Sequence, residues 1–255
     1  MKPKVLVLTV VLLLMAMVPT FVMAKTQAKR EKMGRVRIDI RQPIGPQLDA
    51  QLGVSSRGPR SATMALKPMV SRGVGIQPNA VYGQTIDNFE PPMWPSSPEW
   101  IFAEWGLSYV GWDSSDYEAR GGDYSLYSSG WPFNDPYYDN DMLSLAFRPM
   151  DLQGARRLRV RFYHMSDVEF GWDSFYWCGT ADGIWFNCEY YTGSTNGKWR
   201  QVVLDTNKGD WALDGMLGSP WAAFGFIFES DSSITYRGTF VDQFFMRSWG
   251  PQPSN

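Results

Sequence analysis

Histidine and cysteine are scarce in this chain, which has one histidine and two cysteines among 255 residues. His164 alone cannot supply both imidazoles of a His-Glu-x-x-His zinc site, which excludes a metallopeptidase of that type. The sequence also lacks a Gly-x-Ser-x-Gly elbow, a phosphate-binding loop and the spacing of an EF-hand. His164 continues the inward face of an alternating segment, which favours a packed side chain over a catalytic base. We expect no enzyme activity from these classes.

Aromatic residues are almost absent from the first third of the chain. Of the 39 aromatic residues, 38 lie between Tyr82 and Trp249, and these include all twelve tryptophans. A stretch of this length is enough for one domain with a hydrophobic core. We therefore assign residues 81–250 to a single globular domain and expect the function to reside there.

The first 24 residues resemble an export signal. Lys2 and Lys4 precede an apolar run from Val5 to Val18, and Ala24 ends a plausible cleavage site. The alternative is an uncleaved N-terminal membrane anchor, because the stretch from Val5 to Met23 is nearly long enough to span a bilayer. Pro19 and Thr20 interrupt that stretch and favour cleavage, which predicts a secreted, extracellular protein. No cysteine lies at the end of the run, so a bacterial lipoprotein anchor is not expected.

Residues 25–80 carry positive charge and few large apolar side chains. From Lys25 to Arg72 there are 11 Lys or Arg and three acidic residues, a net charge of +8. Such a segment cannot bury enough surface to offset its ordering entropy, so we expect a disordered basic linker. From residue 76 onward 11 basic residues face 23 acidic ones, a net charge of −12, which argues against a nucleic-acid partner. A membrane contact is expected only if the leader is uncleaved.

The pattern after residue 80 is that of short strands separated by turns. Residues 157–164 alternate strictly, with Leu158, Val160 and Phe162 on one face and Arg157, Arg159 and Arg161 on the other. Further strands are predicted at 84–89, 108–112, 124–127, 142–149, 174–179, 183–189, 199–204, 222–228 and 239–247, with a short one at 35–40. This pattern predicts an all-β fold, an antiparallel two-sheet jelly-roll β-sandwich preceded by the signal peptide and the disordered basic spacer. Core positions are expected at Trp177, Trp199, Phe224, Phe226 and Phe228.

Cys178 and Cys188 lie ten positions apart, on either side of the turn signal Ala181-Asp182-Gly183. In an exported chain this spacing predicts a disulfide that ties a hairpin. Half of a metal site is the alternative, but no second Cys or His pair accompanies it.

Several short motifs in order resemble a known family. They include Asp87-Asn88-Phe89-Glu90, Gly122-Asp123-Tyr124-Ser125-Leu126, Glu169-Phe170-Gly171-Trp172-Asp173, Gly197-Lys198-Trp199 and Gly238-Thr239-Phe240-Val241-Asp242. Over residues 81–249 this order resembles the MAM-like jelly-roll domains that accompany secreted bacterial immune-inhibitor-A-type metallopeptidases. The resemblance implies a non-catalytic accessory module that binds a surface, a glycan or a catalytic neighbour.

The resemblance also implies a structural calcium ion near the domain ends, with Asp87, Glu90 and Asp242 as its ligands. The family usually ends in Val-Asp-Asp, whereas this chain has Gln243 after Asp242. The acid-rich stretch of Asp135, Asp139, Asn140 and Asp141 is a second candidate, since calcium prefers several oxygen ligands. Ordinary solvated turn residues are the alternative at both places.

Aromatic residues on loops are the candidate ligand-binding residues, because an aromatic face can stack on a sugar ring and loops often carry binding. The candidates are Trp94, Trp100, Trp105, Trp131, Tyr137 and Tyr138. The expected partner is an extracellular glycan or a surface protein. Two alternatives remain open: a structural or protein-interaction domain without a small ligand, and a glycoside hydrolase that uses a pair such as Glu169 and Asp173. The arginine row at 157, 159 and 161 is expected to be a solvated face beside acids of neighbouring strands.

Overall fold

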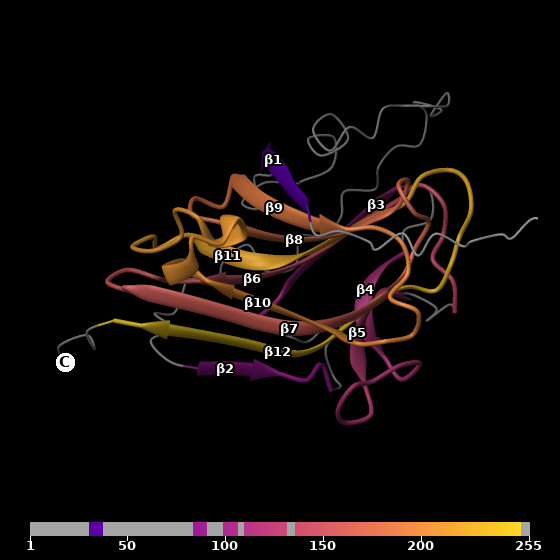
Figure 1. Ribbon diagram of the computed structural model, residues 1–255, viewed down its shortest axis with the longest axis horizontal. Helices are drawn as coiled ribbons and strands as arrows, with labels where there is room; N and C mark the ends of the chain where they lie inside the picture. Colours follow the sequence, from indigo (N-terminus) through magenta and orange to yellow (C-terminus); the bar gives the residue numbers. More distant parts are fainter. Residues whose placement is uncertain (1–30, 38–83, 91–98, 107–109, 132–135, 251–255) are drawn as a thin grey trace, which may run out of the picture.

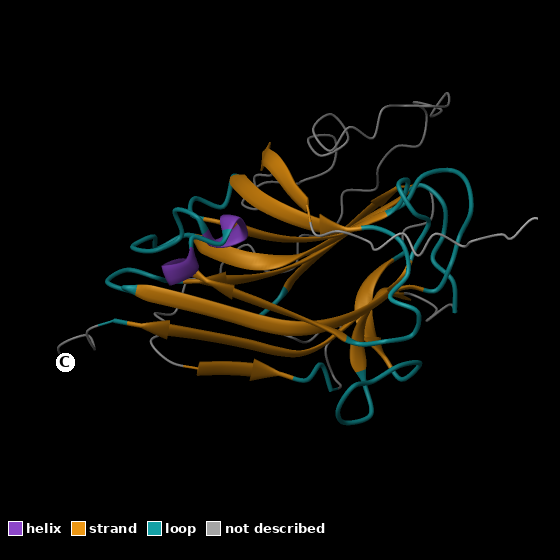
Figure 2. Ribbon diagram, in the orientation of Figure 1, coloured by secondary structure: helices purple, strands orange, loops and turns teal. Residues whose placement is uncertain are grey.

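The computed structural model describes residues 31–37, 84–90, 99–106, 110–131 and 136–250, with only the backbone described at 31–37, 103–106 and 131. Within these ranges the strands form two antiparallel sheets that pack face to face (Figures 1 and 2). The first sheet has the order β1 (Glu31–Arg37), β9 (Trp185–Tyr191), β8 (Ser174–Thr180), β11 (Ala222–Glu229), β6 (Met142–Met150), β3 (Ile101–Gly106). The second has the order β10 (Arg200–Asp205), β7 (Arg157–Asp167), β12 (Gly238–Trp249), β5 (Ser125–Trp131), β4 (Gly111–Ser115), with β2 (Gln84–Asp87) beside β12.

The chain passes repeatedly from one sheet to the other, for example from β6 to β7, from β7 to β8 and from β11 to β12. Two short 3-10 helices, η1 (Thr206–Lys208) and η2 (Trp211–Leu213), follow β10 before the chain returns to the first sheet. This arrangement confirms the predicted two-sheet jelly-roll sandwich.

Most predicted strands are present, but some boundaries differ. The strand predicted at 108–112 is β4 at Gly111–Ser115, and β3 at Ile101–Gly106 was not predicted. Within the predicted spacer, β1 spans Glu31–Arg37 and pairs with β9, so the short strand predicted at 35–40 is present but lies closer to the N-terminus. An edge strand of this kind is held by backbone hydrogen bonds to its neighbour, which composition does not reveal.

Aromatic rings fill the space between the sheets. Phe162 of β7 lies at the centre, with ring centroids 5.9 Å from Trp177 and 5.0 Å from Phe226. These residues are at most 1% exposed, as are Phe224 and Phe228. Burial of so many rings removes a large apolar area from water and stabilises the sandwich. The core prediction holds for these residues, whereas Trp199 is only partly buried, against a small separate cluster with Phe240.

The outward face of the first sheet is also buried. Leu145, Phe147, Phe186 and Ile227 point away from the space between the sheets, yet each is at most 1% exposed. The second sheet differs, because its outward positions include the exposed Arg159, consistent with one buried face and one face in water.

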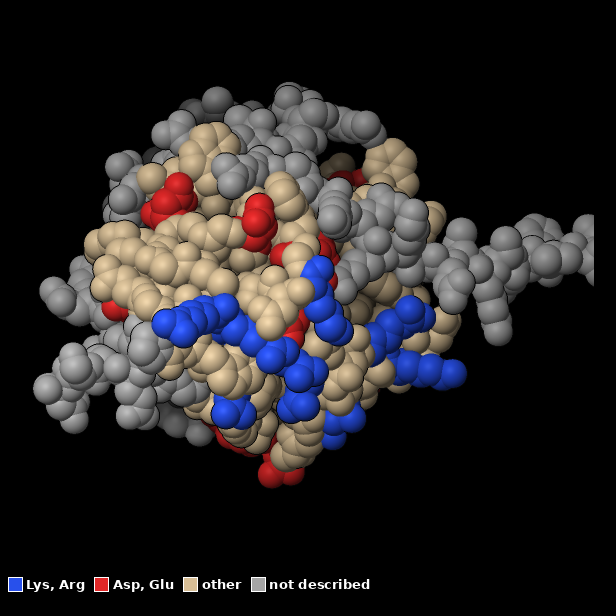
Figure 3. Space-filling model, turned by 60° about the vertical axis from the view of Figure 1, so that its left-hand side comes forward, with Lys and Arg blue, Asp and Glu red and all other residues tan. Residues whose placement is uncertain are grey.

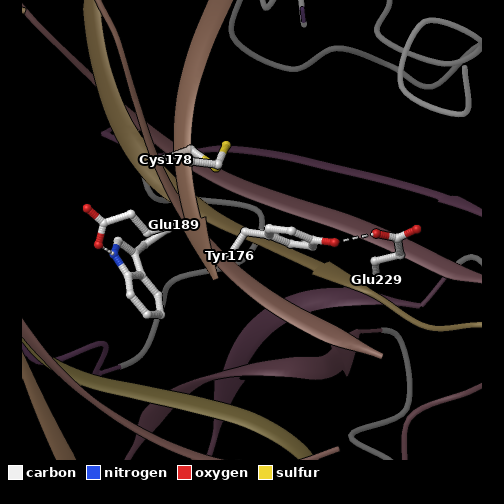
Figure 4. Close-up of a disulfide and its surroundings, with 6 residues drawn as sticks. Tyr176, Cys178, Glu189 and Glu229 are labelled. Atoms are coloured by element: carbon white, nitrogen blue, oxygen red, sulfur yellow. Dashed lines mark hydrogen bonds between the residues drawn. A yellow bond between two sulfur atoms is a disulfide. The ribbon is translucent and has the colours of Figure 1, made fainter. Parts of the chain in front are cut away.

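Buried polar groups in the first sheet are hydrogen-bonded. The indole of Trp177 donates to Glu189 at 3.2 Å, and the hydroxyl of Tyr176 donates to Glu229 at 2.8 Å (Figure 4). Burial, with the nearby Glu229 carboxylate, raises the pKa of Tyr176, so its phenol remains protonated. Both pairs flank the disulfide and satisfy groups that would otherwise destabilise the core.

The turn between β8 and β9 follows from its sequence. Gly183 adopts a positive φ of 70°, and the carboxylate of Asp182 accepts the backbone N–H groups of Ile184 and Trp185, each at 2.8 Å. The two strands then pair so that Cys178 faces Cys188.

The predicted signal peptide, residues 1–24, lies outside the described residues, as does most of the spacer. Among the residues that the structure describes, no helix has the length and apolar character needed to cross a bilayer.

Cys178 and Cys188 form a disulfide, and both are fully buried. We predict that the double variant Cys178→Ala/Cys188→Ala unfolds at lower urea concentration, with a loss of roughly 2–3 kcal/mol, because the bridge closes a short loop in the unfolded chain. Urea unfolding monitored by tryptophan fluorescence measures this loss. Non-reducing peptide mapping of the wild type is the control, and equal midpoints for the two proteins would contradict the prediction.

Candidate functional site

The six aromatic residues predicted to bind a ligand differ in their exposure and in how fully the structure describes them. Trp94 lies outside the described residues, and for Trp105 in β3 and Trp131 in β5 only the backbone is described. Tyr137 is 55% exposed, as a binding residue should be. Trp100 and Tyr138 are 3% and 1% exposed, so the prediction that they contact a ligand is wrong.

Trp100 belongs to the core because both its ring and its N–H group find partners inside the sandwich. The ring is stacked on Phe226 with centroids 6.0 Å apart, and it meets Phe244 edge-on at 5.3 Å. The indole N–H donates to the carboxylate of Asp87 at 2.8 Å. A tryptophan with these contacts closes the interior rather than offering a sugar platform.

Tyr138 also acts as an internal anchor. Its ring packs edge-on against Phe228, with centroids 5.0 Å apart, and its hydroxyl hydrogen-bonds to the carboxylate of Asp173. The backbone N–H of Tyr138 donates to the carbonyl of Tyr236 at 3.1 Å. Tyr138 therefore joins three loops at one end of the sandwich, with its neighbour Tyr137 left at the surface.

Exposed apolar side chains are concentrated on these joined loops. The exposed fractions are 55% for Tyr137, 54% for Phe170, 54% for Trp172, 55% for Ile234 and 38% for Tyr236. We refer to these five residues as the loop-end group. Apart from Tyr137, the sequence analysis did not identify them as binding residues.

Hydrogen bonds hold the loops of this group together. The carboxylate of Glu169 accepts the hydroxyl of Ser233 at 2.8 Å and the N–H of Ile234 at 3.4 Å. Gly171, with a φ of 81°, donates its N–H to the hydroxyl of Thr192 at 2.7 Å. The pattern that could have marked this turn is the glycine flanked by two aromatics and two acids in residues 169–173.

Behind the exposed side chains lie three carboxyl groups. Glu169, Asp173 and Asp231 have oxygen atoms within 4.8 Å of one another, the one acidic group of this kind found in the described ranges. Asp173 is fully buried, and its carboxyl accepts the N–H of Asp231 at 2.8 Å as well as the Tyr138 hydroxyl. Burial raises the pKa of Asp173 to about 6, despite these hydrogen bonds.

This geometry counts against the glycosidase pair Glu169 and Asp173. A catalytic carboxyl must reach the glycosidic bond or its water. The carboxyl of Asp173 has both oxygens engaged by protein groups and no exposed surface. His164 is similarly enclosed, 2% exposed, and burial lowers its pKa to about 3, as expected for a packed histidine.

The predicted calcium ligands are only partly assembled. Asp87 is turned towards the core, where its carboxylate accepts the Trp100 indole and pairs with Arg148 at 3.5 Å. Glu90 and Asp242 instead lie on either side of the turn at residues 120–124. Glu90 accepts the N–H of Asp123 at 3.0 Å, and Asp242 accepts the N–H of Gly121 at 2.9 Å.

The second predicted calcium stretch forms a turn before β6. Asp135 lies outside the described residues, and Asp141 has a positive φ of 56° and donates its N–H to the carbonyl of Asp231 at 2.7 Å. The carbonyl of Asp139 accepts the hydroxyl of Ser230, while Asn140 is exposed. The observed contacts of these residues are those of a backbone turn.

No family model matches the chain, and no curated protein matches it. Among solved structures, it is similar to the K1 adhesin domain of Lys-gingipain from Porphyromonas gingivalis W83, with 14% identity, 66% of this chain and 99% of that chain covered, and a TM-score of 0.46. A family 61 carbohydrate-binding module in complex with β-1,4-galactotriose shares 11% identity, with 64% and 91% covered and a TM-score of 0.41. A family 11 carbohydrate-binding module of a cellulosomal cellulase of Clostridium thermocellum shares 9% identity, with 69% of this chain and 100% of that chain covered and a TM-score of 0.40. At these TM-scores none of the likenesses bears on what this chain binds.

The raised pKa of Asp173 predicts a pH-dependent stability. The pKa of Asp173 is 3.8 in the unfolded chain and about 6 in the folded protein. Between these two pH values the carboxyl is protonated in the folded state and ionised in the unfolded state. The contribution of this group to the free energy of unfolding is therefore full below pH 3.8 and is lost as the pH rises to about 6. Asp173→Asn keeps an acceptor for Asp231 and does not titrate, so the variant should gain stability relative to the wild type as the pH rises.

Urea midpoints of the two proteins at pH 4 and pH 7 test this. Asp113, whose pKa burial also raises to about 6, titrates in both proteins, so its effect cancels in the difference. Parallel pH profiles for the two proteins would show that the environment of Asp173 has been misjudged.

Proposed function

We propose that this chain is an exported, non-catalytic module that binds carbohydrate through the loop-end group. The observation that carries the proposal is the exposure of Tyr137, Phe170 and Trp172, each more than half exposed, on loops that hydrogen bonds hold in place. Aromatic rings normally lie in the core of a domain this rich in them, so their retention at one end calls for a function.

The chemistry of this surface suits a sugar. An exposed ring can stack on the C–H face of a sugar, and the neighbouring carboxylate of Glu169 can accept hydrogen bonds from the sugar hydroxyls. The anchoring of these loops by Tyr138 and Asp173 lowers the entropy lost on binding.

Two further features support the proposal of an exported binding module. The buried disulfide favours an oxidising compartment outside the cytosol. His164 and Asp173 are enclosed and cannot reach a substrate, which supports a non-catalytic role. The resemblance to MAM-like accessory domains stays a prediction, and a protein-interaction role without a small ligand is the alternative that the binding experiment must separate.

We predict that Trp172→Ala and Tyr137→Ala each weaken binding to a polysaccharide that the wild type retains, by about 10-fold, the equivalent of one lost stacking contact. A polysaccharide array followed by affinity electrophoresis gives the ratio. Trp221→Ala is the matched control, because Trp221 is 51% exposed but lies at the opposite end of β11 from the loop-end group.

If the wild type binds none of the neutral and acidic polysaccharides, this result would contradict glycan binding and favour the protein-interaction role. Equal losses for all three variants would remove the loop-end group as the binding surface. Release of reducing ends during incubation would instead reveal a hydrolase.

Structural calcium near Glu90 and Asp242 also stays a prediction. Burial raises the pKa of Asp242, and the like charge of Glu90 adds to this effect. Two carboxylates held close together repel each other, and a cation there would relieve the repulsion. Asp87, which is turned towards Arg148, does not fit the predicted set of three ligands.

If calcium binds here, EDTA should lower the thermal unfolding midpoint of the wild type and added calcium should restore it. Asp242→Asn should abolish this response, whereas Asp214→Asn, at an exposed turn, should retain it. A thermal unfolding midpoint of the wild type that EDTA does not change would contradict the prediction.

A further inference from the structure

The outward face of β7 and β12 carries a regular arrangement of arginines and aromatic rings. Across the two strands Arg157 faces Trp249, Arg159 faces Arg247, and Arg161 faces Phe245. We call these six residues the arginine face. Their inward neighbours on β7, Leu158 and Val160, are fully buried, so the alternation of the strand directs every one of these arginines outward.

The rings and the guanidinium groups are in contact. The guanidinium carbons of Arg157 and Arg247 lie 4.7 Å and 4.9 Å from the centre of the Trp249 ring, and that of Arg161 lies 5.0 Å from the Phe245 ring. Cation–π contacts at these distances hold the flat guanidinium groups against the sheet. Rings therefore order Arg161 and Arg247, and Arg157 is held both by Trp249 and by its ion pair with Asp205.

Positive charge on this face is only partly compensated. Arg157 forms an ion pair with Asp205, which also lies opposite Arg159 in the pairing of β10 with β7 and interacts with its charge. Among the described residues no acid forms an ion pair with Arg161 or Arg247. Arg159 and Arg247 face each other directly and are both exposed. Like charges directly opposite on neighbouring strands destabilise a sheet, so this pair has a cost that a ligand would remove.

We propose that the arginine face binds an anionic polysaccharide, one that carries carboxylate or sulfate groups, along the direction of β7. Arginine presents a planar fork of donors that matches a carboxylate or sulfate in two hydrogen bonds. Alternate residues on a strand are about 6.7 Å apart, so Arg157, Arg159 and Arg161 form a row about 13 Å long. Trp249 and Phe245 add apolar surface beside this row.

The surrounding surface favours this ligand over other polyanions. Figure 3 shows Lys and Arg side chains gathered in a band on one face of the domain, with acidic side chains above and below the band and a few beside it. From residue 76 onward the chain has 11 basic and 23 acidic residues, so a broad anionic surface such as a membrane would also meet repulsion. Duplex DNA carries one charge per about 1.7 Å, much denser than a row with a spacing of about 6.7 Å.

This binding surface is distinct from the loop-end group. Arg247 and Trp249 lie at the end of β12, whereas Tyr236 precedes its first residue, Gly238. In the part of the first sheet whose side chains are described, the outward apolar residues are buried, so no equivalent face is seen there. The two proposals can therefore succeed or fail independently.

The test uses the purified full chain with polygalacturonate and heparin as anionic polysaccharides and dextran as the neutral probe. Duplex DNA and anionic phospholipid vesicles serve as the other polyanions. Wild-type protein should bind one or both anionic probes, with an affinity that falls steeply as salt rises, and should not bind dextran. Arg159→Gln/Arg247→Gln should weaken binding at least 10-fold. Lys198→Gln/Arg237→Gln removes the same charge on loops away from the arginine face and should bind as the wild type does.

A second arginine variant controls for the possibility that the glutamine variant does not fold. Arg159→Lys/Arg247→Lys keeps the charge but removes the planar fork, and it should bind more weakly than the wild type and more tightly than the glutamine variant. A steep salt dependence separates this binding from stacking on the five uncharged residues of the loop-end group. Equal binding by the wild type and both arginine variants would overturn the proposal, as would an affinity for the anionic probes that does not fall as salt rises. Tighter binding to duplex DNA or to anionic phospholipid vesicles than to either polysaccharide would overturn it in favour of that ligand.

Discussion

The packing of Phe162 between the two sheets is the constraint on which the rest of the structure depends. Its ring meets Trp177 of β8 and Phe226 of β11, so it joins strands that are distant in sequence and lie in different layers. Because side chains alternate along a strand, a buried Phe162 directs Arg161 and Tyr163 outward. The same contact that closes the core therefore creates the outward arginine face.

The buried polar groups explain why the loops at one end of the sandwich are held in place. A core filled with aromatic rings tolerates a hydroxyl or a carboxyl only where each finds a partner. Tyr138 and Asp173 satisfy each other, and together they tie residues 136–141 to residues 168–173. Side chains next to this anchor, such as Tyr137 and Trp172, stay at the surface because the anchor already fills the interior.

Sequence patterns predicted the strands best where alternation was strict. The strand at 157–164 was predicted from its alternation, and the observed β7 extends it to Asp167. In contrast β3, at Ile101–Gly106, was missed because its pattern is short and lies among loop-like residues, and its place is decided by pairing with β6. Trp100 and Trp172 both lie among turn residues, yet one is 3% and the other 54% exposed. Their difference depends on which distant side chains reach them.

The sequence by itself determined the all-β class and the hairpin that pairs Cys178 with Cys188, and it excluded a His-Glu-x-x-His zinc site. These features depend on local alternation, on turn residues and on which side chains are present at all. Only the tertiary structure decided which aromatics are exposed and which cation meets which ring. Trp249 lies beside Arg157 because β12 pairs with β7 across about 90 residues of chain, and no local pattern encodes that register.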